Sequence, residues 1–377
     1  MIVLGNQLAL QFAIADKTDF ISIDEFKYMR IAENAGGLRP ILDLTFELKD
    51  PDLVSYFNNG NIISLMYGIK EPTSDILQFE IMGDNKGKEY HVGSTISILG
   101  AMYNRGFTNK VKTYTYYNKK SYQALSMIAG QNSLKFRTNV TNTNDSQTWY
   151  QTGMKDWSMA QFIADRAYRD NSTFFSWGFD NNNLYFYDIR ELLKNGPKWT
   201  LTTNSVGKND NSPVVSIGTY SCDDSNAGTN GDLAGRNVTN VGFNLDTGEF
   251  SNPSYALKTF TTLDTKRINV NTTDCQNYNY SIITEDEHAH SIEAVDQNRR
   301  NNILFSSYTC HIPVPGQYRD FRLFDVVQLI PTETDKEAEG FYFITGIARK
   351  YENNLYKTLL TLNRESANGI KGNLVGG

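Results

Sequence analysis

The chain has 377 residues, 40% of them hydrophobic and 21% charged, which predicts roughly two to four compact globular units. A formal net charge of −6 argues against a general binder of nucleic acid or of anionic membranes. No apolar run reaches the roughly 18 residues that cross a bilayer, so we expect no membrane span. The N-terminal segment lacks a basic region and indicates a strand rather than a signal peptide.

The first 111 residues have the pattern of an antiparallel barrel or sandwich. Residues 40–48 alternate, with Leu42, Leu44 and Phe46 on one face. Further strands are predicted at 61–68, 76–81 and 94–100, because Gly, Pro and Asn separate these apolar segments.

Residues 112–200 change to a mixture of helices and strands. Ser158 is predicted to cap a helix whose apolar stripe includes Met159 and Ile163, and a β-hairpin is predicted from 174–179 and 184–189. An earlier helix should begin at Ser121 and end at Gly130, before a strand at 134–136. This order of elements indicates a small α+β unit.

The stretch from about 201 to 302 is polar, with a long Asn/Asp/Gly-rich loop at 221–237. A capping box at 284–287 predicts a helix that runs to about residue 302. Its apolar stripe is narrow, which favours a surface helix or one that bridges subunits. We therefore expect Ile292, Val295 and Arg299 to lie at a subunit interface.

The most regular pattern is near the C-terminus. Two extended segments, 341–348 and 355–362, flank a polar turn and predict a hairpin. Both faces of this hairpin are largely apolar, so it should be packed on both sides. Tyr342, Ile344 and Tyr356 are further candidates for the subunit interface.

The cysteines and histidines give little indication of a disulfide or a metal site. Cys222, Cys275 and Cys310 are odd in number and unpaired in spacing, which favours buried or idle thiols in a reducing compartment. His288 and His290 stand beside acidic residues. They could share a metal ion only if the segment were extended, because residues two apart on a helix point in different directions.

Carboxylate pairs are the remaining candidates for catalysis. Asp180 with Asp188, or Asp223 with Asp224, could support hydrolysis if a cleft brought them together. Turn and loop positions explain these residues more simply. No nucleophile elbow, phosphate-binding loop or dinucleotide fingerprint is present, so we expect no catalytic residue, no cofactor and no metal.

The order of these segments resembles the central hub protein of phage tail baseplates, which is similar to the N-terminal part of type VI secretion spike proteins. The segments that carry it are SMAQFIADRAY, FFSWGFDNNNLYFYDI, FRLFDVVQLIP and GFYFITGIARKYENNLYKTLLTLNRES. The resemblance implies a mainly β, α+β protein with two tube-like antiparallel β-barrel domains and α+β/helical insertions. The implied division is 1–111 for the first barrel, 112–200 with 240–302 for the helical domain, 201–239 with 303–365 for the second barrel, and 366–377 for a C-terminal tail.

The resemblance also implies a structural, non-enzymatic role in the virion, at the baseplate or tail tip of a phage assembled in its host's cytoplasm. Three copies would form a pseudo-six-fold ring that adapts a six-fold tail tube to a three-fold central spike. The expected partners are the tail tube protein, a separate spike protein and surrounding baseplate proteins, and DNA would pass through the channel without specific binding. The alternatives are a carbohydrate-binding or carbohydrate-active β protein of a phage tail and the hub of a contractile injection system.

Overall fold

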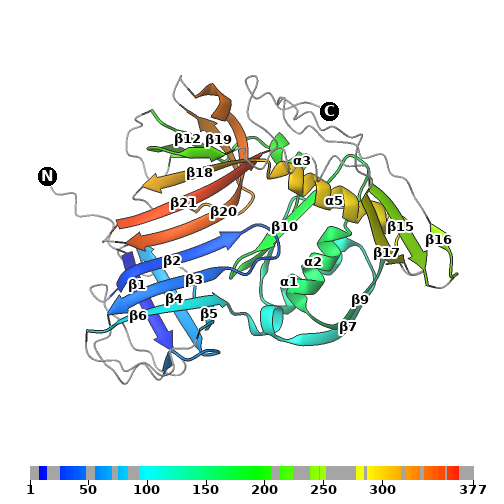
Figure 1. The fold of residues 1–377 in the computed structure, drawn as a ribbon, viewed down its shortest axis with the longest axis horizontal. Helices are drawn as coiled ribbons and strands as arrows, with labels where there is room; N and C mark the ends of the chain where they lie inside the picture. The colour runs from blue at the N-terminus through cyan, green and yellow to red at the C-terminus, as the bar shows by residue number, and fades with distance from the viewer. Residues whose placement is uncertain are drawn as a thin grey trace.

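The computed structural model describes residues 8–14, 26–47, 56–69, 75–83, 93–204, 212–223, 238–245, 247–251, 277–283, 287–315, 320–331, 335–352 and 355–364. These residues form a mainly β protein in which a mixed sheet of 13 strands runs through two β-units, with a helical unit beside them (Figure 1). The expected α+β, mainly β class is confirmed at this level.

The large sheet follows the order β1-β4-β5-β6-β3-β2-β20-β19-β12-β13, with β21, β18 and β14 branching from β20. The strands of the first β-unit are β1 (Leu8–Ile14), β2 (Phe26–Asn34), β3 (Ile41–Glu47), β4 (Ile62–Ile69), β5 (Leu77–Ile81) and β6 (Thr95–Met102). Those of the second are β12 (Trp199–Thr202), β13 (Val214–Ser216), β14 (Ser221–Asp223), β18 (Tyr308–Pro315), β19 (Val326–Ile330), β20 (Gly340–Glu352) and β21 (Leu355–Arg364). The strands predicted at 40–48, 61–68, 76–81 and 94–100 are all present.

Strand β20 joins the two β-units. Its first residues pair with β19, its last residues pair with β2, and β21 pairs along most of its length. In Figure 1 this hairpin lies between the blue strands of the first unit, such as β2, and strands β12, β18 and β19 of the second. Phe343 and Ile347 belong to the core of the second unit, whereas Tyr351 and Tyr356 belong to that of the first. The predicted hairpin is therefore confirmed, but packing on both faces holds only in part, because Leu355 and Leu359 of β21 are 58% and 38% exposed. Residues 353 and 354 of its turn lie outside the described residues.

The helical unit encloses a third core. It contains α1 (Ser121–Gln131), α2 (Asp156–Asp165), the two-stranded ribbon β7 (Val111–Lys119) and β9 (Gln147–Lys155), and the sheet β10-β11-β8 (Phe175–Phe179, Asn183–Asp188 and Lys135–Thr138). A π-helical turn at Arg105–Asn109 leads into it, and α3 (Ile189–Lys194) follows β11. The predicted helices and the 174–189 hairpin are present. The β7–β9 ribbon was missed because Lys119 and its partner Gln147, at the facing ends of the two strands, are 28 positions apart and the pairing register shifts twice.

Helix α2 begins at Asp156, two residues before the predicted Ser158 cap. The Asp156 carboxylate is buried and accepts hydrogen bonds from Asn132 and Gln151, at 2.7 and 2.8 Å, and from Lys112. A buried carboxylate with three donors at a helix start suits the helix dipole, so these tertiary contacts set the boundary. The sequence pattern gives no sign of these contacts, because they join residues that are distant in the chain.

A short backbone bridge fastens the helical unit to the large sheet. The amide of Ala35 donates to Thr345 O, and that of Gly36 donates to Trp177 O, both at 2.7 Å. A side chain at Gly178 would place its Cβ 3.3 Å from Ala35 Cα, so this close approach favours glycine.

The remaining described elements are a small sheet, β16-β15-β17 (Phe250–Ser251, Val238–Asn244 and Asn277–Ile283), a 3-10 turn at Lys336–Ala338, and helix α5 (Ser291–Phe305). Helix α5 was predicted to begin near residue 286. It starts five residues later, at Ser291, after turn residues 289 and 290, and residues 284–286 of the proposed capping box lie outside the described residues.

Candidate interaction groove

Helix α5 is held in the fold by polar side chains, which corrects the expectation of a surface helix. Its buried residues include Asp296, Gln297, Asn298, Arg300 and Asn301. The narrow apolar stripe was misleading because buried polar side chains add to the apolar contacts of Ile292, Ala294 and Phe305.

Asn298 shows how these amides work. Its Oδ1 accepts from the amide of Phe175 at 2.9 Å, and its Nδ2 donates to Ala167 O at 2.8 Å, just beyond the end of α2. Asn302 Nδ2 donates to Phe175 O at 2.9 Å. Helix α5 thus satisfies both backbone groups of Phe175 on edge strand β10 and a carbonyl after α2, which would otherwise be buried unpaired.

The other face of α5 lines a groove of about 780 Å³ where the helical unit meets the large sheet. Val295 and Arg299 line one side, and the opposite wall is Ala35 to Leu38 after β2, with Thr345 and Asn363 of the β20–β21 hairpin. Arg299 is exposed and Val295 half-buried. Leu38 is 66% exposed, a large apolar side chain open to solvent at the edge of this groove.

Asp165 supplies the groove's carboxylate. Burial raises its pKa to about 6, and the guanidinium groups of Arg166 and Arg299 only partly offset this. The groove therefore changes charge within the physiological range of pH. Asp165 was not singled out in the sequence, where it is one acidic residue at the end of an amphipathic helix.

The six predicted interface residues separate into two groups. Val295 and Arg299 lie in the groove, and Ile292, on the same helix, is only 8% exposed. Tyr342 and Ile344 are fully enclosed by the second core and Tyr356 is 3% exposed in the first, so their side chains have no free surface to offer another subunit. Their apolar pattern reflects a strand shared by two cores of one chain. The subunit interface stays a prediction, and it now rests on α5.

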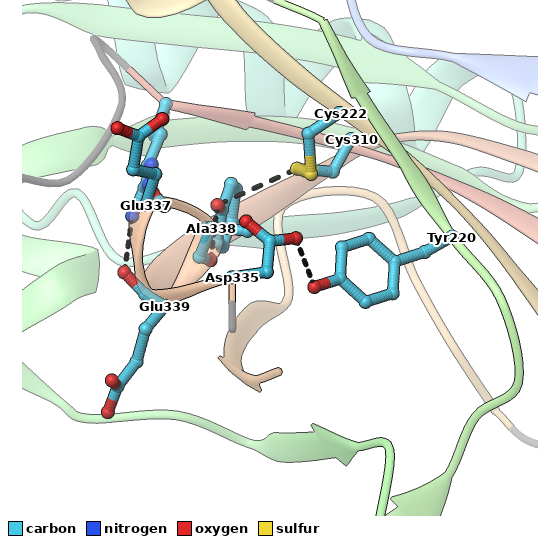
Figure 2. Close-up of a disulfide and its surroundings, with 9 residues drawn as sticks. Tyr220, Cys222, Cys310, Asp335, Glu337, Ala338 and Glu339 are labelled. Atoms are coloured by element: carbon cyan, nitrogen blue, oxygen red, sulfur yellow. Dashed lines mark hydrogen bonds between the residues drawn. A yellow bond between two sulfur atoms is a disulfide. The ribbon is translucent and has the colours of Figure 1, made fainter. Parts of the chain in front are cut away.

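A disulfide connects Cys222 of β14 to Cys310 of β18 (Figure 2), contrary to the expectation of idle thiols. The antiparallel register places the two residues opposite each other, with their Cα atoms 4.1 Å apart across a sequence separation of 88. The pair was not predicted because the number of cysteines is odd and their spacing shows no pairs. Only the pairing of β14 with β18 brings the two cysteines together. Cys275 lies outside the described residues.

Two tyrosines complete the surroundings of the disulfide. Tyr342 Oη lies 3.6 Å from Cys310 Sγ and donates its proton to Ala338 O at 2.7 Å. Tyr220 donates to Asp335 at 2.5 Å, and Figure 2 shows this pair facing the turn that carries Ala338. The disulfide and these bonds together fix β14 and the turn after residue 335 to the second β-unit.

Arg364, the last described residue, is buried in the same corner. Its guanidinium donates to Glu339 O at 2.8 Å and to Glu337 O, and it lies over the rings of Tyr308 and Tyr342 at 4.8 and 4.4 Å. Burial lowers its pKa. Carbonyl oxygens and aromatic faces thus hold this cation within the corner.

The histidines singled out in the sequence have structural partners in the described part of the chain. His288 Nε2 lies 2.9 Å from Arg166 O, and His290 stacks on Tyr168 at 4.3 Å and bonds Glu293. No cluster of three potential metal ligands occurs among the described residues.

The candidate aspartates have local structural roles. Asp180 accepts from its own turn at Asn182 and Asn183, whereas Asp188 caps α3. Asp223 lies at the end of β14, and Asp224 lies outside the described residues. None of the helices in the described ranges is long and apolar enough to cross a membrane.

Comparison with known proteins gives a likeness of fold. No family model matches the sequence, and no curated protein matches it. A tail protein from Neisseria meningitidis MC58 superposes with a TM-score of 0.59 at 13% identity, covering 95% of this chain and 97% of that one. The 43 kDa tail protein of prophage MuSo2 from Shewanella oneidensis gives 0.53 at 11% identity, covering 95% and 98%.

A third solved structure extends the likeness to secretion systems. It is a type VI secretion system component of E. coli, described as structurally similar to the bacteriophage T4 tail proteins gp27 and gp5. It gives a TM-score of 0.51 at 10% identity, covering 97% of this chain and 80% of that one. The resemblance found in the sequence is thus confirmed in the fold, which these tail and secretion proteins share.

Proposed function

We propose that this chain, which has the fold of phage tail proteins and of a type VI secretion component, is a structural hub of a phage tail baseplate or tail tip. The observation that carries the proposal is the end-to-end match to two tail proteins, each covering at least 95% of both chains. A fold alone does not fix a function, so the assembly that the chain forms in solution is the deciding property.

The proposed assembly is a homotrimer, in which two tube-like β-barrel domains per chain form a pseudo-six-fold ring. Such a ring adapts a six-fold tail tube to a three-fold spike, contacts surrounding baseplate proteins and lets DNA pass through without specific binding. It has no enzymatic activity and resides in the virion. Two β-units joined through one strand, β20, support the pairing of domains within a chain.

The groove beside α5 is the proposed place of subunit contact. Val295, Arg299 and Leu38 combine an apolar surface with one exposed cation. A mixed surface of this kind is common in interfaces between folded subunits.

The test is the mass of the purified protein in solution, where three chains of 42.7 kDa give about 128 kDa by light scattering, three times the chain mass. Val295→Asp should shift the population toward monomer while the thermal unfolding midpoint stays near that of the original protein. Tyr117→Asp, at an exposed position on β7, is the matched control and should leave the mass unchanged. A strictly monomeric original protein, without a ring in electron micrographs, would contradict the proposal.

A second candidate function is carbohydrate binding, which one surface feature favours. Tyr114, Tyr117 and Tyr150 on the β7–β9 ribbon are 41%, 77% and 50% exposed. Tyrosines offer an apolar ring with a polar tip, which suits contact with sugars as well as proteins. Binding on a glycan panel that is lost in Tyr117→Ala would favour this function over the hub.

A further inference from the structure

A second, smaller cavity lies where the three units of the fold meet. Its volume is about 220 Å³. The first β-unit contributes Glu33 and Tyr67, the helical unit contributes Lys135, Arg137 and residues 180–183, and the second β-unit contributes residues 320–322 and Arg349. Ordinary small-molecule sites occupy roughly 300–1,000 Å³, so this cavity suits one side chain or a small ion.

Three carboxylates of this cavity already have strong donors. Asp180 Oδ1 accepts from the amides of Asn182 and Asn183 at 2.8 and 2.7 Å, and its Oδ2 accepts from the Tyr185 hydroxyl at 2.5 Å. The other two are paired with arginines, Glu33 with Arg349 and Asp320 with Arg322. Asp180 and Glu33 thus have little capacity left for a cationic ligand, whereas Asp320, whose side chain is 53% exposed, keeps acceptor sites that face solvent.

The cavity's free hydrogen-bonding capacity belongs mainly to donors. Lys135 Nζ has no partner among the described residues, and Arg137 uses Nε on Asn183 Oδ1 at 3.0 Å, which leaves its terminal nitrogens. The side-chain amide of Asn181 has both polar atoms buried and unpartnered within the described ranges. Buried polar atoms without partners are uncommon in native proteins, and Asn181 lines this cavity, so an occupant of the cavity can supply the missing partners.

We propose that this cavity receives one acidic side chain, from a peptide segment of a partner protein. Lys135 and Arg137 would bind its carboxylate through charge-assisted hydrogen bonds. The Asn181 side chain offers an NH₂ group that donates and a carbonyl oxygen that accepts, and together they complement the C=O and N–H of a backbone peptide group. This second contact distinguishes a peptide segment from a free anion. The inference does not depend on the trimer proposed above.

The charge balance of the cavity sets the expected strength of binding. Four basic residues, Lys135, Arg137, Arg322 and Arg349, are matched by four acidic ones, Glu33, Asp75, Asp180 and Asp320. An incoming carboxylate is therefore attracted by two cations that have no ionic partner in the described part of the chain, Lys135 and Arg137. The cavity as a whole has no net charge, so long-range attraction is weak. Binding of an isolated residue should be weak and should weaken further as salt rises.

The test uses two blocked single-residue peptides on the full chain, N-acetyl-glutamyl-methylamide and its neutral glutaminyl counterpart, with acetate as the free anion. Binding is followed by NMR or calorimetry up to about 10 mM, a range that covers millimolar dissociation constants. We expect the glutamyl peptide to bind and the other two probes to bind at least about tenfold more weakly, the loss expected for one charge-assisted hydrogen bond.

Substitutions inside and outside the cavity show whether the glutamyl peptide binds in it. Arg137→Gln and the exposed Lys135→Gln should each weaken the glutamyl peptide about tenfold, whereas Arg105→Gln, an exposed cation outside the cavity, should leave it unchanged. If Arg137→Gln fails to fold, Lys135→Gln decides the question alone. Absence of glutamyl binding, or equal binding by Lys135→Gln and the original protein, would overturn the site. Equal affinity for acetate would overturn the assignment to a peptide segment.

Discussion

Arg349 Nη1 donates to Glu33 Oε2 at 2.7 Å, across 316 residues of sequence. Arg349 lies on β20 and Glu33 on β2, the two strands through which the β-units are joined, and both side chains are buried. Arg349 Nη2 also donates to Phe321 O at 3.1 Å. Burial raises the pKa of Glu33, and the attraction of Arg349 opposes that rise. The pair thus ties the beginning of the chain to its end.

Removal of one partner of this pair should destabilise the protein strongly. Arg349→Met leaves the Glu33 carboxyl buried without its cation, and we expect a loss of about 3–5 kcal/mol in the free energy of unfolding. The double variant Glu33→Met/Arg349→Met removes both charges and should recover much of that loss. Urea unfolding of the three proteins measures it, and a double variant no better than the single one would show that the pair itself is not the cause.

Gly340 should not tolerate a side chain. Its φ is +141°, and a Cβ there would lie 2.5 Å from Arg364 Nη1. Gly340→Ala should cost about 1–3 kcal/mol of unfolding free energy, because backbone strain adds to displacement of the guanidinium.

The matched control for Gly340 is Gly130→Ala within α1, where a Cβ meets nothing within 4 Å. It should stabilise the protein by roughly 0.5–1 kcal/mol, since alanine is the better helix former. Opposite shifts of the thermal midpoints are expected, and similar shifts would contradict the role assigned to Gly340.

Asp165 should make stability depend on pH. Its pKa is about 6 in the folded protein against an ordinary value of 3.8. The folded state therefore keeps a proton that the unfolded chain has released, so this contribution to stability is complete below pH 4 and is lost as pH rises to about 6. Asp165→Asn should reduce this dependence, of which a part remains because burial also raises the pKa values of Glu33, Asp188 and Asp296. The variant should be more stable than the original protein at pH 7, by about 1–3 kcal/mol.

Unfolding curves between pH 4 and 8 measure this effect. Asp43→Asn, on β3 and outside the groove, serves as the control and should leave the slope of stability against pH in place. If Asp165→Asn retained the full slope of the original protein, Asp165 would not be a source of it.

Asn298 and Arg299 are neighbours on α5 with opposite environments. Asn298→Ala leaves the Phe175 amide and the Ala167 carbonyl without their partner, so we expect a loss of about 1–3 kcal/mol in unfolding free energy. Arg299→Ala, at an exposed position, should change it by less than about 0.5 kcal/mol. Comparable losses in thermal unfolding would argue against the buried amide network.

Several elements followed from local pattern. The β20–β21 hairpin, the strands of the first unit and helices α1 and α2 were predicted because periodicity and turn residues are written in adjacent positions. The start of α2 was missed because a buried network around Asp156 sets it. The burial of α5 was missed because much of its contact surface consists of polar side chains such as Asn298.

The residues of the groove could not be predicted from the sequence, except for Val295 and Arg299. Asp165, Leu38 and Asn363 come from three elements far apart in the chain, and no spacing rule brings them together. The Cys222–Cys310 bond has the same character, since it follows from the register of two strands separated by 88 residues.

By itself the sequence determined the β-rich class, the local elements and the resemblance to tail hubs, since these depend on residue order along short segments. The tertiary structure alone decided which surfaces remain available. It enclosed Tyr342 and Ile344 in a core, joined two cysteines and placed Glu33 against Arg349. Contacts between distant residues require the packed chain, because closure of the loops between them is specified by the whole core rather than by any one segment.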